Sequence, residues 1–349
     1  MPVIPQICHP HAIRALGLDF RKTIIEAVEN PFLVNRLDLD CCRSYGVDGM
    51  RIWIPADPVE TLDDGESVWQ VDKKGQKTGR VDFMGGGGIV PLQEKPALES
   101  EEDIENIGVL SADELLRTDK FQSIRQIVDE AREELFLITP PGAFTFEYVT
   151  FMRGKEQALM DLKERPEFAA RMIDKATEVA IQHAIALASM GIDGLYIGDT
   201  FGGLIGPALF HEFCVPAVKR FVAALKPHGV LIYLHICGNS TQLFELMADT
   251  GVDCIEPLDP LGGVVVADAK RRVGHRVALM GGVNTVALAH GPLDEVIEDC
   301  KRCIGEGAPG GGYILAAGDM LPTETSREKV EAMIHTAKTY GQYPLTHVA

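Results

Sequence analysis

The chain has 349 residues and a formal net charge of −18, with 33 Lys and Arg against 51 Asp and Glu. This length allows one large α/β domain or two smaller ones, and 46% hydrophobic residues can form a sizeable core. The acidic balance argues against nucleic acid as a partner, because phosphate binding needs a basic surface. No apolar run reaches the roughly 20 residues that a membrane-spanning helix needs.

Cysteine use and the first residues bear on the compartment. Eight cysteines in a chain of this length do not form the pattern of a disulfide framework. Residues 1–6 lack the charged and apolar regions of a signal peptide. We therefore expect a cytoplasmic protein with reduced thiols. The sequence leaves its oligomeric state open, and a homo-oligomer is compatible with it.

Strand-like and helix-like segments alternate along most of the chain. Strands are predicted at residues 49–54, 135–139, 194–199, 230–237, 254–259, 277–281 and 312–317. Helices are predicted at about residues 207–226, 239–250, 265–272, 293–306 and 326–340. Alternation at this spacing predicts a parallel sheet. Seven strands suit a (β/α)8 TIM-type barrel with one strand missed better than an open sheet. We expect a single α/β barrel domain over residues 1–349, with a helical and hairpin portion at about 1–130.

Residues 56–100 interrupt this alternation. Residues 67–71 and 78–83 flank a polar turn at residues 72–77, which predicts a β-hairpin. The glycine run at residues 85–88 is not a phosphate loop, because no Gly-Lys-Ser/Thr follows it. We expect this segment to be an N-terminal β-hairpin insertion over the barrel mouth.

His235 and Cys237 end the apolar run at residues 230–237. Residues two apart on a strand point to the same face, and imidazole and thiolate are both good zinc ligands. The C-terminal ends of barrel strands carry the active site in this fold class. The pattern therefore favours a catalytic metal site, and the alternative is a buried His and a buried Cys that are merely neighbours.

Other polar residues follow the predicted strands and would share the same rim with this pair: Asp199, Glu256, Asp259, Asn284 and Asp319. Among them we take Asp199, Glu256 and Asn284 as candidate catalytic residues. Each also has a plainer explanation, since Asp and Asn cap helices and begin turns.

A catalytic zinc site has three protein ligands and one open position. Asp319, directly after the last predicted strand, is the best candidate for the third ligand. Glu147 is a candidate for a further ligand that substrate displaces, or a carboxylate at a helix start. Cys254 begins its strand, which is the wrong end of a barrel. Cys300 and Cys303 lie on a predicted helix away from the strand ends, so we expect them to be irrelevant to the metal.

Several motifs in this part of the chain resemble the uroporphyrinogen decarboxylase superfamily. They are Leu-His-Ile-Cys-Gly-Asn at 234–239, Gly-Val-Asp at 251–253, Gly-Gly-Val-Asn at 281–284, Gly-Tyr-Ile-Leu-Ala at 312–316 and Pro-Thr-Glu-Thr at 322–325, with Gly142 to Thr145 and Gly154 upstream. Within the superfamily, the chain is most similar to the zinc-dependent methyltransferases that work with corrinoid proteins. The resemblance covers residues 130–340. It implies a TIM-type barrel, zinc held by His235, Cys237 and Asp319, and a partner corrinoid protein that carries cob(I)alamin or methylcobalamin.

Two departures from the family bear on the reaction. Arg14, Arg21 and Arg36 are scattered and do not form the arginine-rich motif that grips the carboxylates of a porphyrin substrate. Thiol-methylating members usually have a cysteine where this chain has Asp319. A carboxylate donates less electron density to zinc than a thiolate does, which leaves zinc a stronger Lewis acid and favours a reaction in which oxygen leaves.

The resemblance and the residues together favour a zinc methyltransferase that removes the methyl group of a small methylated compound, best a methoxylated aromatic. Residues that could line its pocket are Trp53, Met84, Phe144, Phe146, Tyr148 and Met320. The alternatives are a metal-free decarboxylase that uses a cation such as Arg51, a methylcobalamin:thiol methyltransferase, and a binding protein without catalytic activity.

Overall fold

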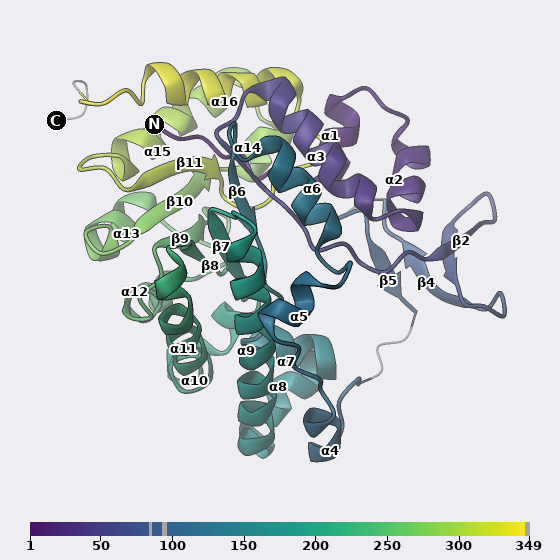
Figure 1. The fold of residues 1–349 in the computed structure, drawn as a ribbon. Helices are drawn as coiled ribbons and strands as arrows, with labels where there is room; N and C mark the ends of the chain where they lie inside the picture. Colours follow the sequence, from purple (N-terminus) through teal and green to yellow (C-terminus); the bar gives the residue numbers. More distant parts are fainter. Residues whose placement is uncertain (84–85, 93–95, 346–349) are drawn as a thin grey trace.

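The computed structural model describes residues 1–83, 86–92 and 96–345, and its centre is a seven-stranded parallel sheet (Figure 1). The strands lie in the sheet in chain order: β1 (Gly49–Arg51), β6 (Phe136–Thr139), β7 (Gly194–Gly198), β8 (Leu231–His235), β9 (Cys254–Leu258), β10 (Ala278–Val283) and β11 (Tyr313–Ala317). Every neighbouring pair is parallel, which requires a crossover connection between consecutive strands. All seven strands predicted from the sequence are confirmed.

Helices supply these crossovers and surround the sheet (Figure 1). In chain order they are α1 (His9–Ala15), α2 (Phe20–Glu29), α3 (Phe32–Tyr45), α4 (Glu101–Glu105), α5 (Ala112–Leu116), α6 (Gln122–Ala131), α7 (Phe146–Arg153), α8 (Lys155–Glu164), α9 (Pro166–Ser189), α10 (Gly206–Leu209), α11 (Val215–Leu225), α12 (Phe244–Asp249), α13 (Val266–Val273), α14 (Thr285–His290), α15 (Leu293–Gly307) and α16 (Arg327–Thr339). Each of the longer helices buries one apolar stripe; in α6, Ile124, Ile127, Val128 and Ala131 recur at helical spacing and are buried.

The N-terminal segment lies between the two outer strands of the parallel sheet. The Ile4 N–H donates to the Leu315 carbonyl of β11 at 3.0 Å, and Val3 forms a parallel bridge with Leu315. The Asp48 N–H, just ahead of β1, donates to the Val3 carbonyl at 3.1 Å. The backbone of this segment therefore joins β11 to the start of β1.

A small inner core lies apart from the main hydrophobic core. Its buried members are Ile4, Ile138, Tyr196, Tyr233, Cys254, Met280 and Ala316. One of them comes from the N-terminal segment and one from each of the strands β6 to β11. Side chains from both ends of the sheet therefore share one core, which requires the sheet to curl.

The segment between β1 and α4 forms a separate antiparallel sheet (Figure 1). Its strands are β2 (Glu60–Asp63), β3 (Val68–Val71), β4 (Lys77–Val81) and β5 (Ile89–Pro91), paired in that order. The predicted hairpin is β3–β4, and Asp72 shapes its turn by accepting from the Lys74 and Gln76 N–H groups at 2.8 Å. The sequence analysis missed β2 and did not pair β5 with the hairpin. Met84 and Gly85 lie outside the described residues.

Two glycines have conformational reasons for their places. Gly46 ends α3 in the left-handed region, with φ +66°, a conformation that glycine adopts without strain. Gly281 in β10 has φ +126°, and a Cβ there would lie 2.5 Å from the Leu258 nitrogen of β9. The close contact between these two strands therefore depends on glycine.

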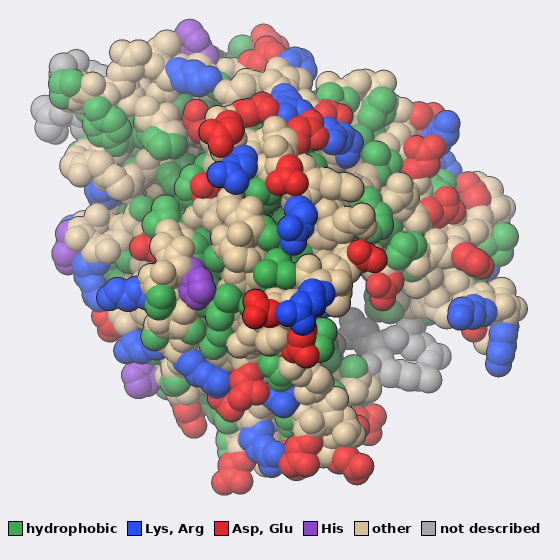
Figure 2. Space-filling view, in the orientation of Figure 1, with side chains coloured by type: hydrophobic (Ala, Val, Ile, Leu, Met, Phe, Trp, Pro, Cys, Tyr) green, Lys and Arg blue, Asp and Glu red, His purple; other side chains and the backbone are tan. Residues whose placement is uncertain are grey.

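The surface carries acidic and basic side chains interspersed with each other on the face shown in Figure 2. Many of them form exposed ion pairs, such as Arg36 with Glu130 at 2.6 Å. In the part of the chain that the structure describes, no helix is both long and apolar enough to span a bilayer.

Candidate metal centre

Three side chains meet at one end of the parallel sheet. His235 is the last residue of β8, Cys237 follows it by two residues, and Asp319 lies two residues beyond β11. One ligand atom from each, a ring nitrogen, a sulfur and a carboxylate oxygen, lies within 4.8 Å of the other two. These atoms are close enough to share one cation. Within the described residues this is the one such group of three, and it consists of the three ligands expected from the sequence.

His235 and Asp319 come from strands that are not neighbours. β9 and β10 separate β8 from β11. At about 4.8 Å between neighbouring strands, the ends of β8 and β11 would lie about 14 Å apart in a flat sheet. The curl of the sheet brings them together, and parallel strands place all their C-terminal ends at one rim. The third ligand therefore depends on the global fold, whereas the His235–Cys237 pair depends only on one strand.

The surroundings of the three groups differ. His235 is buried, and Cys237 and Asp319 are half-buried. Burial, together with the nearby Asp319 carboxylate, raises the pKa of the Cys237 thiol to about 11. The Asp319 Oδ1 accepts from the Met320 N–H at 2.8 Å, which fixes the carboxylate. With no cation present the thiol keeps its proton at neutral pH, and a metal ion would have to displace that proton.

Glu256 and Arg51 form a buried ion pair behind His235. The Arg51 Nη2 lies 2.7 Å from the Glu256 Oε1, and these side chains are 7% and 1% exposed. The same Oε1 lies 3.6 Å from the His235 Nδ1, so the carboxylate faces the imidazole. Burial opposes ionisation of Glu256, but Arg51 and His235 outweigh it and hold the pKa of Glu256 below its ordinary value. The guanidinium also packs 3.8 Å from the ring centre of Tyr196 and contacts Gln6 at 3.3 Å.

This arrangement gives Glu256 and Arg51 definite roles. A carboxylate on one nitrogen of a metal-binding histidine fixes the tautomer and the orientation of the ring. Glu256, predicted as a catalytic residue, lies 3.6 Å from the His235 Nδ1, which has no hydrogen-bond partner among the described residues. The pairing of Arg51 with Glu256 was not predicted. The position of Arg51 at the end of β1 places it at the rim but does not identify its partner.

Asp199 lies fully buried just after β7. Its Oδ1 accepts from the Glu147 N–H at 3.1 Å, while its Oδ2 has no hydrogen-bond partner among the described residues. Burial raises the pKa of Asp199 to about 7, and the Glu147 carboxylate adds to the shift. Glu147 lies over the end of β7, where a Cβ on Gly198 would approach its Oε2 to 2.7 Å. Both predicted residues are thus near the rim, but Glu147 is not part of the three-residue group.

Asn284 occupies the N-cap of α14. Its Oδ1 accepts from the Val286 N–H at 2.8 Å and the Ala287 N–H at 3.2 Å. Two backbone donors occupy the side-chain oxygen, as in helix capping. The structure therefore places Asn284 in the capping role that the sequence analysis kept as its alternative.

The other cysteines lie apart from the centre. Cys254 is the first residue of β9, at the opposite end of the strand from the rim. Cys300 and Cys303 are buried along α15, and burial raises the pKa of the Cys300 thiol to about 12 and raises that of Cys303 as well. None of the three belongs to the group that could hold a metal.

A cavity of about 700 Å³ adjoins the centre, and we call it the side chamber. Its wall comes from the start of α1, from α2 and α3, from the segment after β1, and from the antiparallel sheet, together with Met320. Met320 follows the ligand Asp319. Trp53, in the same wall, meets the Tyr196 ring edge-on at 6.2 Å, and Tyr196 lies 5.1 Å from the His235 ring. One layer of aromatic rings therefore links the chamber to the centre.

The aromatic residues predicted for a pocket divide into two groups. Trp53 and Met320 line the side chamber. Phe144 and Phe146 are instead fully buried in the main core, where Phe144 stacks on Phe221 at 4.8 Å between ring centres. Tyr148 is half-buried against the same core. Apolar side chains alone did not distinguish pocket from core, because aromatic residues beside the strand ends occur in both.

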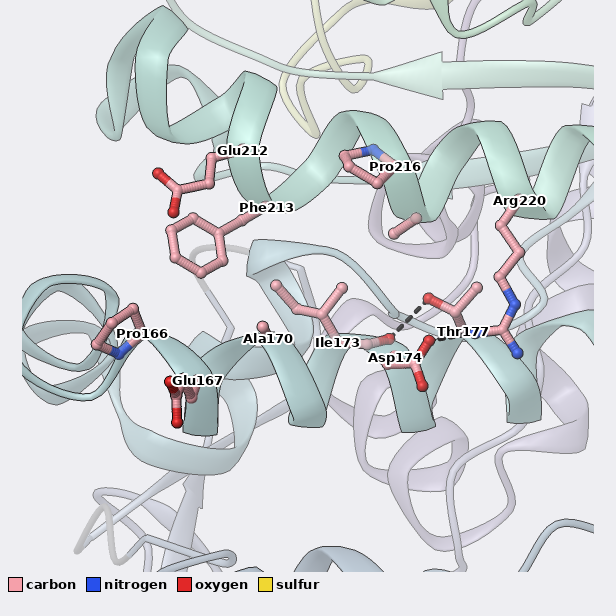
Figure 3. A pocket seen from close by; sticks show the side chains of 11 residues that line it. Pro166, Glu167, Ala170, Ile173, Asp174, Thr177, Glu212, Phe213, Pro216 and Arg220 are labelled. Carbon is pink, nitrogen blue, oxygen red and sulfur yellow. Dashed lines mark hydrogen bonds and ion pairs between the residues drawn. The ribbon is translucent and has the colours of Figure 1, made fainter.

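Another hollow of about 460 Å³ lies between α9 and α11 (Figure 3). Phe213 and Ile173 face it, and Arg220 at one end pairs with Asp174. None of the predicted site residues lines it. The wall of the side chamber, by contrast, includes Met320, the chain neighbour of the candidate ligand Asp319.

Residues 78–340 match the uroporphyrinogen decarboxylase (URO-D) family, and the chain belongs to this family. The family expected from the motifs is thus confirmed. The match starts at residue 78, well before the residue 130 at which the recognisable motifs begin. It therefore includes part of the antiparallel sheet but not the first three helices.

Two curated relatives and one solved structure are similar to this chain over most of its length. A methylated-thiol–coenzyme M methyltransferase of Methanosarcina mazei is 25% identical over 247 residues, covering 69% of this chain and 64% of that protein, so the match spans less than two thirds of its length. A uroporphyrinogen decarboxylase of Neisseria meningitidis serogroup C is 26% identical over 251 residues, 69% of each chain. A solved methyltransferase from Methanosarcina mazei has a TM-score of 0.72 at 19% identity, covering 98% of this chain and 94% of its own. That structure shares the fold.

Proposed function

We propose that the chain is a zinc-dependent methyltransferase. It would move a methyl group from a small methylated substrate, best a methoxylated aromatic, to the cobalt of cob(I)alamin on a partner corrinoid protein in the cytoplasm. The observation that carries this proposal is the meeting of His235, Cys237 and Asp319 at the rim of the sheet. The methyltransferase among the relatives supports methyl transfer as the reaction class.

The donor set fits zinc. Imidazole nitrogen, thiolate sulfur and carboxylate oxygen are the three ligand types that zinc accepts, and three protein ligands leave an open position. When bound there, zinc supplies a Lewis acid for the substrate oxygen. In the overall reaction the bond from oxygen to the methyl carbon breaks, its electron pair stays on oxygen, and cobalt supplies the pair for the new cobalt–carbon bond.

The protein residues have supporting roles in this proposal. Glu256, 3.6 Å from the His235 Nδ1, would orient the imidazole on closer approach, and Arg51 would keep Glu256 ionised. Asp199 and Glu147 lie at the same rim, where they would face a substrate or a fourth ligand position. We also propose that the N-terminal segment is the eighth strand position of a closed TIM-type barrel. Its bonds to β11 and to Asp48 and its share in the inner core support this.

Two enzyme alternatives differ in how well the structure supports them. Decarboxylation of a porphyrin requires free cations for several carboxylates, whereas Arg51 is buried against Glu256 and Arg21 and Arg36 pair with Asp63 and Glu130. Methylation of a thiol from methylcobalamin would use the same metal centre, and the printed name of the Methanosarcina mazei relative favours it as the second candidate.

Metal analysis of the purified protein, followed by a methyl-transfer assay, tests the proposal. We expect about one zinc per chain, lost in Cys237→Ser and retained in the control Cys300→Ser. Cobalt methylation is then followed by the absorbance of methylcobalamin, with reduced cobalamin and a panel of methyl ethers, thioethers and amines. Transfer from an ether supports the proposal. Demethylation of methylcobalamin by thiols alone would favour the second candidate, and carbon dioxide release without zinc would favour the decarboxylase.

A further inference from the structure

The side chamber is built mostly from the part of the chain that precedes the family match. Its wall includes Ala27 and Val28 of α2, Val34 of α3, and residues 53–59 after β1, all ahead of residue 78. Only residues 86–89 and Met320 come from the matched region. The metal centre belongs to the family region, whereas the cavity beside it belongs largely to the rest of this chain.

The wall is apolar and carries few polar groups. Its charged side chain is Asp57, and no Lys or Arg is among the described residues that line it. A volume of about 700 Å³ with a mainly apolar wall is in the range of small-molecule sites. The cation beside the wall is Arg51, 5.3 Å from the ring centre of Trp53, and its charge is already paired with Glu256.

His9 gives this wall a polar group with spare hydrogen-bonding capacity. Its Nε2 lies buried against Gly87, and the Gly87 backbone is a hydrogen-bonding neighbour of the imidazole, which leaves the other ring nitrogen for a ligand. Burial lowers the pKa of His9 to about 4, so the imidazole is neutral at physiological pH. A neutral imidazole offers one donor and one acceptor, and leaving either unpaired in a buried place is unfavourable.

We infer that the side chamber binds the methyl donor, and that it selects an uncharged aromatic ring with a hydroxyl group, for which His9 is the hydrogen-bond partner. This inference rests on the proposed function and adds the charge class of the substrate and a specificity-determining residue. A ring packs against Trp53, Val28 and Met320, and the hydroxyl satisfies His9.

The same wall disfavours anionic ligands. An anion in an apolar cavity must lose its water without gaining a cation, which is strongly unfavourable. This desolvation cost applies to carboxylated porphyrins and to coenzyme M, which carries a sulfonate group. The chamber therefore favours a different charge class of ligand from those named for the two relatives, a porphyrin and coenzyme M.

Tryptophan fluorescence can report binding in the chamber directly. The chain has two tryptophans, Trp53 in the wall and Trp69 on β3. A Trp69→Phe variant leaves Trp53 as the single reporter. We would titrate this variant, free of zinc, with 2-methoxyphenol, anisole and 2-methoxybenzoate. We expect 2-methoxyphenol to bind more than about 10-fold more tightly than the benzoate, and about 5-fold more tightly than anisole.

Variants then assign the polar contact. His9→Phe should bring the affinity for 2-methoxyphenol down to that for anisole and leave anisole unchanged. His228→Phe, at an exposed histidine beyond α11, is the matched control and should change neither. Val28→Phe should fill the chamber and weaken all three ligands, and circular dichroism checks that each variant is folded.

Three results would overturn the inference: equal affinity for the benzoate, no response of Trp53 to any ether, or an equal loss of anisole and 2-methoxyphenol binding in His9→Phe. Because the titrations use zinc-free protein, they are independent of methyl transfer. Binding as expected without transfer by the zinc-loaded protein would refute the proposed function and leave the chamber assignment. Transfer from ethers that do not bind the chamber would refute the chamber assignment alone.

Discussion

Removal of the Arg51 charge should destabilise the protein through Glu256. In Arg51→Met the Glu256 carboxylate, 1% exposed, loses the guanidinium at 2.7 Å. Breaking a buried ion pair from one side costs about 3–5 kcal/mol, because the remaining charge is uncompensated. Removing both charges in Arg51→Met/Glu256→Gln should recover about half of that loss or more, since an amide needs no counterion.

The contribution of Glu256 to stability should depend on pH with opposite signs in the wild type and in Arg51→Met. In the wild type the folded pKa of Glu256 lies below its ordinary value of 4.5, so its contribution to stability is present above that value and is lost as the pH falls through the folded pKa. Without Arg51, burial dominates and raises the pKa of Glu256. The carboxyl then contributes stability below its ordinary pKa, and this contribution is lost as the pH rises.

Urea unfolding of the metal-free protein at several pH values measures both effects. Zinc affinity, from competition with a chelator, adds a second readout: Glu256→Gln should weaken zinc binding about 10- to 100-fold, the usual effect of losing a carboxylate behind a metal-binding histidine. An Arg51→Met variant within 1 kcal/mol of the wild type, or one that loses stability on acidification as the wild type does, would refute this account of the pair.

Other predictions concern single residues. Asp319→Ala should lose zinc and methyl transfer, while Asp319→Cys should bind zinc but demethylate ethers more slowly; unchanged zinc and rates in Asp319→Ala would remove it from the ligand set. The double variant Cys300→Ala/Cys303→Ala should retain zinc. Loss of zinc in this variant would contradict the exclusion of Cys300 and Cys303 from the metal ligands. Asn284→Ala should cost about 1 kcal/mol in urea unfolding without loss of zinc, whereas a loss of rate alone would favour a catalytic role. The pKa of Asp199 is raised to about 7, so its contribution to stability should be lost as the pH rises from about 4 to 7. Asp199→Asn should abolish this loss of stability. A loss that persists in the variant would contradict the raised pKa.

Much of the sheet, and the closeness of His235, Cys237 and Asp319, could be predicted from the sequence because each strand and each strand end is marked by a local pattern. The seven strands are short apolar runs between turn residues. His235 and Cys237 share a strand face by their spacing, and Asp319 follows a strand directly. A position after a strand places a side chain at the common rim of a parallel sheet, so a local feature was enough to nominate residues from distant strands.

What the sequence could not supply depends on three-dimensional packing. No helix was assigned over the 24 residues of α9, although Pro166 at its first position and Gly191 just past its end mark both ends. Pairing of Arg51 with Glu256 joins the end of β1 to the middle of β9, and no spacing in the sequence relates the two. The side chamber lies between segments that touch only after folding, so Trp53 could be separated from Phe144 only by the structure, which puts one in the cavity wall and the other in the core.

The bridge between Val3 and Leu315 has a consequence for synthesis on the ribosome. Val3 is synthesised long before its partner Leu315, and contacts so distant in sequence form late. Asp319, just after β11, is likewise synthesised after His235 and Cys237. The three side chains of the candidate centre can therefore come together only after β11 has been made.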